Sequence, residues 1–298
     1  MTHEACAAQH YGHWAVKLDW LKHTTDAYNA GTLPKADGYY AGPGTPVYAA
    51  GDDLAPLYSK TPDGIGWVGL RGAMTKGRSS FGGTSNVMTR RAFQVMESDP
   101  EVKGIMIQID SPGGTVAGQH ELSEQIAKAT KPVHAYVDGS MHSAALWAGV
   151  QADRVTAGPM AEIGSIGVVA VVHDSSEMAA KEGIKVHVVS TGDHKGAFTP
   201  GAEVTDEQVA KLQERVDEIN VFFLDAVKKG RGLSASAVSK LATGEDWLAA
   251  KAVEAGLIDA VGTEEQAVAE LLKAIRARDK EQAAKQRIAN ARIRMAGL

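Results

Sequence analysis

Two short apolar runs, each followed at once by a turn of small residues, constrain the fold of this chain more than any other feature. The first run, Ile105–Ile109, leads into Ser111-Pro112-Gly113-Gly114, and the second, Val133–Val137, leads into Asp138–Ala145. Apolar runs of this length, bounded by Gly, Pro and Ser, are typical of buried strands. Each turn precedes a stretch of helical character, so the pattern predicts two strand–turn–helix units.

The same alternation extends along most of the 298 residues. The remaining patterns predict strands at 65–71, 104–109, 133–137, 166–172 and 185–189, and helices at 86–98, 116–130, 144–152 and 175–183. Alternating strands and helices indicate an α/β fold with mainly parallel strands.

The C-terminal third is predicted to be mostly helical. Thr205 and Gln208 have the spacing of a capping box at the start of a long amphipathic helix, which Gly230 and Gly232 end. Two shorter helices, at 234–242 and 247–255, and a final strand and turn at 257–262 are expected to follow.

Three regions are predicted on this basis. Residues 1–64 form an N-terminal arm, with one helix from Trp14 to Tyr28 and loops over 31–64, where Gly, Pro and Asp are frequent. Residues 65–262 form the main domain, and residues 263–298 form a basic helical tail.

The tail has a lopsided charge. From Lys273 onward it holds eight Lys or Arg residues against two acidic ones, and Leu271, Leu272 and Ile275 give it an apolar side. A solvated helix end is the plainer interpretation, and a docking element for an acidic partner is the alternative.

Composition excludes several classes of protein. Cys6 is the single cysteine, so an internal disulfide is impossible, and its polar surroundings disfavour a nucleophilic role. No run approaches the roughly 20 apolar residues of a membrane span, and Met1–Gln9 lacks the pattern of a signal peptide. The net charge of −5 gives no indication of nucleic-acid binding. A cytoplasmic protein without a membrane anchor is therefore expected.

The Gly113-Gly114 turn has a composition that suits an oxyanion hole. Acyl transfer develops negative charge on a carbonyl oxygen, and one fixed N–H donor near that oxygen lowers the barrier by about 3–4 kcal/mol. Glycine allows positive φ and a close approach of the backbone to a substrate. A strand-to-helix turn without any ligand explains the same residues equally well.

Ser143 is the candidate nucleophile. It lies at the predicted start of the helix at 144–152, where unpaired N–H groups favour developing negative charge, and Ala144 and Ala145 leave room for a substrate. The alternative is that Ser143 is only an N-cap. Ser140 is a rival nucleophile, and neither serine lies in a Gly-x-Ser-x-Gly elbow, which disfavours an α/β-hydrolase.

Lys195 is the candidate general base, and Gly192 and Gly196 place it in a loop that can approach the site. Such a base must be neutral, and therefore desolvated or close to another cation. An exposed loop lysine is the commoner case, and His142 and His194 are the other candidate bases. The histidines show no metal-ligand spacing, so neither a metal nor a cofactor is expected.

Four segments in this order resemble the successive motifs of the signal peptide peptidase A family of serine proteases: Ile105–Gly114, Tyr136–Trp147, Ile163–Val168 and Gly192–Pro200. The resemblance implies a ClpP/crotonase-like fold of repeated β-β-α units with C-terminal helices. It implies a serine endopeptidase with Ser143 as nucleophile and Lys195 as base. The implied oxyanion hole consists of amides from the Gly113-Gly114 turn and from Ala144.

Two departures from the family pattern are visible. Ser143-Ala144-Ala145 stands where members often have Ser-Gly-Gly, and the N-terminal anchor of membrane-bound members is not seen. The chain is most similar to the phage branch, the head-maturation proteases related to the lambda-type minor capsid protein. That resemblance implies a homo-oligomer that cleaves capsid, portal or scaffold proteins in the host cytoplasm or the procapsid. The resemblance leaves two arrangements open, in which Lys195 pairs with Ser143 of its own chain or reaches Ser143 of a neighbouring subunit.

Two other functions fit the sequence less well. A crotonase-like acyl-CoA enzyme shares the two-amide oxyanion hole but needs acid/base carboxylates, and no paired glutamates are found on the expected loops. A catalytically inactive scaffold protein of the capsid, with the same fold, is the alternative from another class.

Overall fold

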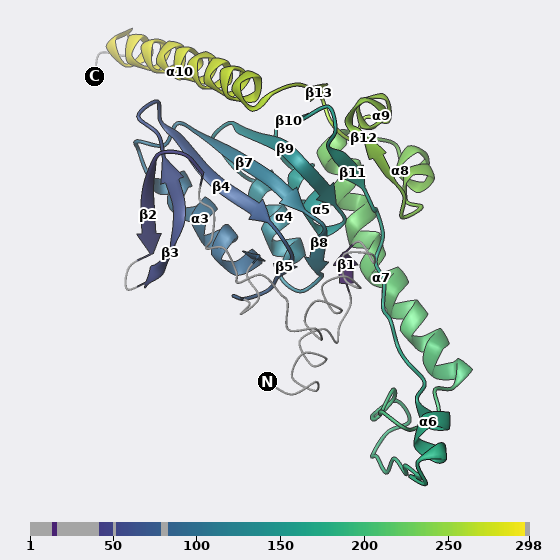
Figure 1. Cartoon of the computed structure of the whole chain (residues 1–298). Coiled ribbons are helices and arrows are strands. Elements are labelled where there is room, and N and C mark those ends of the chain that lie inside the picture. Colours follow the sequence, from purple (N-terminus) through teal and green to yellow (C-terminus); the bar gives the residue numbers. More distant parts are fainter. Residues whose placement is uncertain (1–13, 17–41, 50–51, 79–82, 296–298) are drawn as a thin grey trace.

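A computed structural model describes residues 14–16, 42–49, 52–78 and 83–295. The fold is mixed α/β, as predicted, and a large, mostly parallel sheet lies at its centre (Figure 1). The main path of this sheet has the order β12-β11-β9-β7-β4-β3-β2, and β10 and β13 pair beside β9. Its strands are β2 (Thr45–Ala49), β3 (Asp52–Lys60), β4 (Ile65–Arg71), β7 (Gly104–Ser111), β9 (Val133–His142), β10 (Arg154–Ala157), β11 (Glu162–Gly164), β12 (Asp246–Leu248) and β13 (Ala260–Val261).

The three central strands, β4, β7 and β9, confirm the predicted strands at 65–71, 104–109 and 133–137. They are parallel, and the register aligns Ile65 with Gly104 and Ile105 with Val133. Nearly every residue of β4 and β7 is buried, because helices cover both faces of the sheet. Burial on both faces explains why these strands appear in the sequence as unbroken apolar runs.

The helices confirm most of the predicted pattern. Their bounds are α3 (Asn86–Ser98), α4 (Gln119–Ala127), α5 (Ala144–Gly149), α6 (Ser176–Lys181), α7 (Asp206–Arg231), α8 (Ala235–Leu241), α9 (Ala249–Glu254) and α10 (Glu264–Met295). The capping box of Thr205 and Gln208 is present at the start of α7. Gly232 caps the end of α7 in the left-handed conformation, whereas Gly230 lies inside its last turn.

The N-terminal region differs from the prediction. Trp14–Val16 is not helical but forms a strand, β1, in a second, smaller sheet of order β1-β8-β5-β6; residues 17–28 lie outside the described part. The other members are β5 (Met74–Thr75), β6 (Thr84–Ser85) and β8 (Gly113–Thr115). The hairpin of β2 and β3 lies where loops were expected and extends the large sheet before residue 65. Backbone pairing with neighbouring strands outweighs the local loop preference there.

The predicted strands at 166–172 and 185–189 are wrong. Residues 168–204 leave the sheet after β11 and contain α6 as their longest regular element. From here on, "the arm" means residues 168–204 and not the predicted N-terminal arm. Figure 1 shows that the arm stands away from the body, beside the N-terminal end of α7. Strands need neighbours for their backbone groups, and apart from a single bridge at Val169 the two valine-rich segments of the arm form no ladder.

The first part of helix α10 packs against the large sheet. Ala267, Leu271 and Ile275 are buried against the face of the sheet formed by Ile65, Trp67, Met106 and Tyr136. Leu271 and Ile275 therefore do not provide the apolar surface for a partner that the sequence suggested. From Asp279 to Arg294 every residue is exposed. The boundary at Gly262 stays a prediction, while packing of the helix continues to Ile275.

None of the helices in the described part is both long and apolar enough to cross a lipid bilayer.

Candidate active site

Ser143 occupies the junction between β9 and α5. Its backbone has φ 52° and ψ −113°, a conformation that non-glycine residues rarely adopt. Its N–H donates to the Gly164 carbonyl oxygen at 2.9 Å, and its own carbonyl accepts from the Trp147 N–H at 2.8 Å. Strain of this kind costs about 1–3 kcal/mol and persists where the surroundings enforce it, most often at functional sites.

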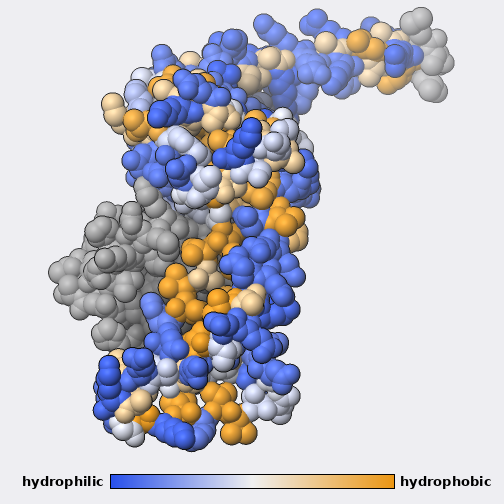
Figure 2. Space-filling model, turned by 90° about the vertical axis from the view of Figure 1, so that its right-hand side faces the viewer, coloured by the Kyte–Doolittle hydropathy of each residue, from blue (hydrophilic) through white to orange (hydrophobic). Residues whose placement is uncertain are grey.

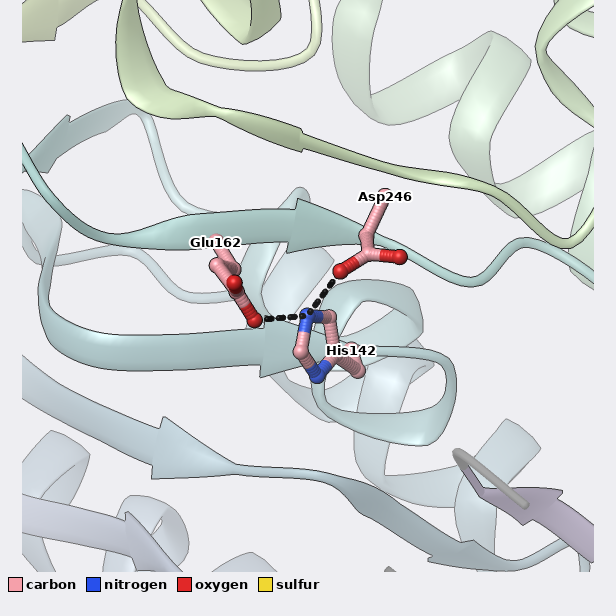
Figure 3. A group of neighbouring side chains, drawn as sticks. All are labelled: His142, Glu162 and Asp246. Carbon is pink, nitrogen blue, oxygen red and sulfur yellow. Dashed lines mark ion pairs between the residues drawn. The ribbon is translucent and has the colours of Figure 1, made fainter. Parts of the chain in front are cut away.

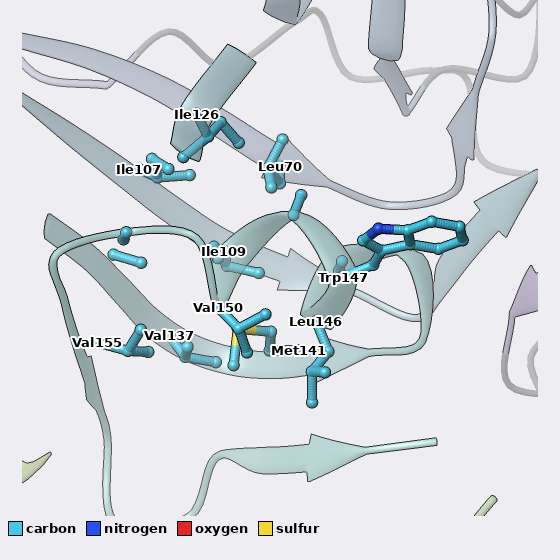
Figure 4. Packing of buried hydrophobic residues seen from close by; sticks show 14 of the residues in the cluster. Leu70, Ile107, Ile109, Ile126, Val137, Met141, Leu146, Trp147, Val150 and Val155 are labelled. Carbon is cyan, nitrogen blue, oxygen red and sulfur yellow. The ribbon is translucent and has the colours of Figure 1, made fainter. Parts of the chain in front are cut away.

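The short helix after Ser143 is held from several sides. Every residue of α5 is buried, and Figure 4 shows its side chains packed among those of the central strands. The Trp147 ring stacks on Phe223 of α7, with centroids 4.9 Å apart and planes within 6°. From α4, the Gln119 Nε2 donates to the Ala144 carbonyl at 2.6 Å. These contacts fix the position of the serine relative to the sheet.

The strand that carries Gly113 and Gly114 contacts α5, the helix that begins directly after Ser143. Ser111 pairs with Met141 at the ends of β7 and β9, so β8, which follows, runs beside the start of α5 and contacts it. Ala144 is fully buried and is the first residue of α5. The first N–H groups of a helix have no acceptor within it.

The two glycines of β8 have different structural roles. Gly113 has φ 97°, and its N–H donates to the Ser111 hydroxyl at 3.2 Å. Gly114 lies so close to β5 that a Cβ atom there would collide with the Met74 carbonyl. Glycine at 114 is thus required by packing of the smaller sheet, whatever its role toward a substrate.

The other edge of β8 is occupied by the chain itself. β1 pairs with β8 in an antiparallel register that aligns Ala15 with Gly114 and Val16 with Gly113. An extended backbone segment therefore lies along the strand that contacts the Ser143–α5 junction. The position is one where a bound peptide would add a strand to the sheet.

Lys195 is not brought to Ser143 of the same chain. It is exposed on the arm, in a turn where its N–H donates to the Gly192 carbonyl at 3.1 Å and Gly196 has φ 99°. The segment around α6, which carries this turn, stands away from α5 and β8 (Figure 1).

The alternative candidates for the nucleophile and the base lie in environments different from those of Ser143 and Lys195. The N–H and hydroxyl of Ser140 both donate to Asp110 Oδ1, at 3.0 and 3.1 Å. His194 shares the exposed position of Lys195 on the arm. The His142 side chain is buried and directed at carboxylates on β11 and β12. Cys6 lies outside the described residues.

No motif in the sequence indicated the cluster that His142 forms. Its Nε2 lies 3.8 Å from Glu162 Oε2 and 3.6 Å from Asp246 Oδ2 (Figure 3). The three residues are far apart along the chain and match no spacing motif. Only the pairing of three strands brings them together.

A partly buried ion pair joins the end of α7 to the segment just before β13. Arg231, whose side chain is 8% exposed, donates two hydrogen bonds to Asp259, at 3.0 and 2.8 Å. The Val155 N–H donates to the same carboxylate at 2.7 Å. Burial by itself raises the pKa of Asp259, but the hydrogen bonds from Arg231 and Val155 outweigh it and hold this pKa below its ordinary value.

Comparison with known families now defines the class of the protein. The profile of peptidase family S49 matches residues 125–278, which include Ser143, the arm and the packed part of α10. The match covers more than half of the chain, and the chain belongs to peptidase family S49. The predicted relation to the signal peptide peptidase A family is confirmed, and a crotonase-like acyl-CoA enzyme is not supported.

Particular relatives are proteases of archaea, bacteria and phage by name. A protein of Methanocaldococcus jannaschii named as a protease is 34% identical over 59% of this chain and 57% of its own length. A protein of Enterococcus faecium named as signal peptide peptidase SppA is 28% identical over 64% and 59%. Capsid assembly protease C of Escherichia phage lambda is 28% identical over 77% and 54%. The chain thus matches between half and three fifths of the length of each of these relatives.

Proposed function

We propose that the protein is a serine endopeptidase in which Ser143 is the nucleophile and Lys195 the general base. The observation that carries the proposal is the strained backbone of Ser143 at a buried strand–helix junction. The proposed donors to the oxyanion are the N–H groups of Ala144, at the start of α5, and of the Gly113-Gly114 strand that contacts α5; the Gly113 N–H would have to exchange its hydrogen bond to the Ser111 hydroxyl for one to the substrate. Lys195 takes the Ser143 proton as the hydroxyl oxygen attacks the peptide carbonyl, and returns it to the leaving amine.

The catalytic pair is proposed to form between two copies of the chain. The arm that carries Lys195 projects from its own body, and large apolar side chains are exposed on it and on α7. Among them, Met178 is 61%, Val189 95%, Val221 63% and Phe222 54% exposed. Figure 2 shows apolar side chains gathered on this face of the molecule and at its arm end. Monomeric proteins rarely leave such surface open, so a second copy of the chain is its expected occupant.

Assembly of the oligomer would also provide the desolvated environment that a lysine needs in order to act as a base. An exposed ammonium group is charged and cannot accept a proton. Burial of the arm against a neighbour removes water from the amine, and desolvation favours the neutral form. The proposed enzyme is therefore active only as an oligomer.

The substrate is proposed to bind as an extended strand along β8. β1 occupies that edge with antiparallel pairing, which demonstrates that the edge accepts an extended backbone. Main-chain hydrogen bonds would then hold the substrate next to Ser143 whatever its sequence, and side-chain contacts would set its preference.

The proposed substrates are capsid, portal or scaffold proteins, cleaved during procapsid maturation in the host cytoplasm or the procapsid. The support is the similarity to capsid assembly protease C of phage lambda over 77% of this chain. The similarity to cellular proteases supports the peptidase activity but not this substrate class.

Co-expression with candidate capsid, portal and scaffold proteins, followed by mass spectrometry of new termini, tests the proposal. We expect defined cleavage sites with the wild-type chain and none with Ser143→Ala. Ser140→Ala is the matched control and should cleave normally. Cleavage that survives Ser143→Ala but is lost in Ser140→Ala would reject the assignment of the nucleophile. Identical termini with and without the wild-type chain would indicate an inactive scaffold protein.

A further inference from the structure

Three strands bring one histidine and two carboxylates to the same face of the sheet beside the nucleophile. In the ladder, Gly164 of β11 pairs with His142 of β9 on one side and with Asp246 of β12 on the other. Glu162 precedes Gly164 by two residues, so it faces the same way. One imidazole and two carboxylates therefore converge, with their ligand atoms all within 4.8 Å of one another.

Gly164 lies between His142 and Asp246 in the sheet, and its lack of a side chain lets these two residues approach each other. It has φ 150°, and a Cβ atom at this position would lie 3.2 Å from the Asp246 Cβ and would collide with the Glu245 carbonyl. Any side chain at 164 would thus force β12 away from β11. With glycine, the Asp246 carboxylate reaches across to the imidazole (Figure 3).

We propose that His142, Glu162 and Asp246 bind a divalent transition-metal ion, with Zn²⁺ or Mn²⁺ as the expected class. Two ligand atoms that bind one Zn²⁺ at about 2.0–2.2 Å in tetrahedral geometry lie about 3.3–3.6 Å apart. The Nε2 of His142 lies 3.6 and 3.8 Å from the two carboxylate oxygens, so small side-chain shifts complete the geometry. A mixed set of imidazole and carboxylate ligands suits these metals, whereas Mg²⁺ and Ca²⁺ prefer oxygen alone.

The exposure of the three side chains fits an ion that enters from solvent. His142 is 3% exposed and provides a fixed ligand, while Asp246 is 27% and Glu162 48% exposed. A cation also offsets the repulsion between two carboxylates held this close.

The ion would tie β12 and β11 to the end of β9. The Gly164 carbonyl accepts the Ser143 N–H, and His142 is the residue directly before Ser143. Both are backbone neighbours of the nucleophile, so the ion would stabilise the segment that holds Ser143. This role is positional, and metal binding itself does not depend on the proposed peptidase function.

Calorimetric titration of the tag-free, chelator-treated full chain with Zn²⁺, and separately with Mn²⁺, tests the site. We expect one saturable site for at least one of the two ions, and a rise of the unfolding temperature when that ion saturates it. Asp246→Asn and Glu162→Gln should each weaken this binding at least about tenfold and remove the thermal shift. Glu254→Gln, an exposed carboxylate on α9, is the matched control and should bind like wild type.

Two results would overturn the inference. The first is the lack of saturable binding of either ion to the wild-type chain, which would leave the cluster as a set of polar contacts between the three strands. The second is unchanged binding in both Asp246→Asn and Glu162→Gln, which would place the ion elsewhere. Two further measurements separate a folding defect from a lost ligand. Circular dichroism shows a loss of secondary structure if a variant is unfolded. The visible spectrum of bound Co²⁺ is altered if a variant is folded but lacks one ligand.

Discussion

Two inactive variants of this protein should restore activity to each other. Ser143→Ala lacks the nucleophile and keeps Lys195, and Lys195→Ala has the opposite defect. If each site takes its serine from one copy and its lysine from a neighbour, random mixing at equal amounts gives both residues to about one quarter of the sites in a symmetric assembly. The expected activity is therefore about one quarter of the wild-type rate, whereas a pair formed within one chain predicts none.

The assay is peptide cleavage after co-expression of the two variants with different tags and isolation of the mixed oligomers. A matched control mixes wild type with the double variant Ser143→Ala/Lys195→Ala at equal amounts. Sites shared between copies give about one quarter of the full rate in this control, and sites within one chain give about half. Zero activity in the first mixture with half activity in the second would refute the shared site, and so would a fully active monomer in light scattering.

Three further predictions concern the surroundings of the site. Asp259→Asn should lower the free energy of unfolding in urea at pH 7 by about 1–3 kcal/mol, because it removes the negative charge that pairs with Arg231, whose remaining bond is to the Gly256 carbonyl. Since folding lowers the pKa of Asp259, this contribution is present above the pKa of the unfolded chain, about 3.9, and is lost as the pH falls below it; an equal difference at pH 3 and pH 7 would contradict this. Deletion of 279–298, all exposed from Asp279 to Arg294, should change the unfolding free energy by less than about 0.5 kcal/mol but weaken co-assembly with a capsid partner, and a large loss of stability would show that this segment belongs to the fold. Deletion of 1–16 should raise the rate of peptide cleavage because it frees the edge of β8, and a slower enzyme would argue against competition between β1 and the substrate.

Much of the fold could be predicted because its signals are local. The buried strands β4, β7 and β9 appear as apolar runs, and the capping box at Thr205 marks the start of α7. Ser143 could be chosen as the candidate nucleophile because the residues around it already predict a strand, a tight turn and a helix. Its assignment stays a prediction, and the strained backbone adds physical support to it.

The remaining features depend on which segments meet in space. The valine-rich segments of the arm have the composition of strands but find no neighbouring ladder, while Leu271 and Ile275 of the basic tail find a sheet face to cover. The tertiary structure alone decided that His142, Glu162 and Asp246 converge, since strand register sets which distant residues become neighbours. Sequence by itself determined the local elements, because each depends on a few adjacent side chains. Register, docking and the separation of Lys195 from Ser143 depend on long-range packing, whose free energy no short stretch of sequence contains.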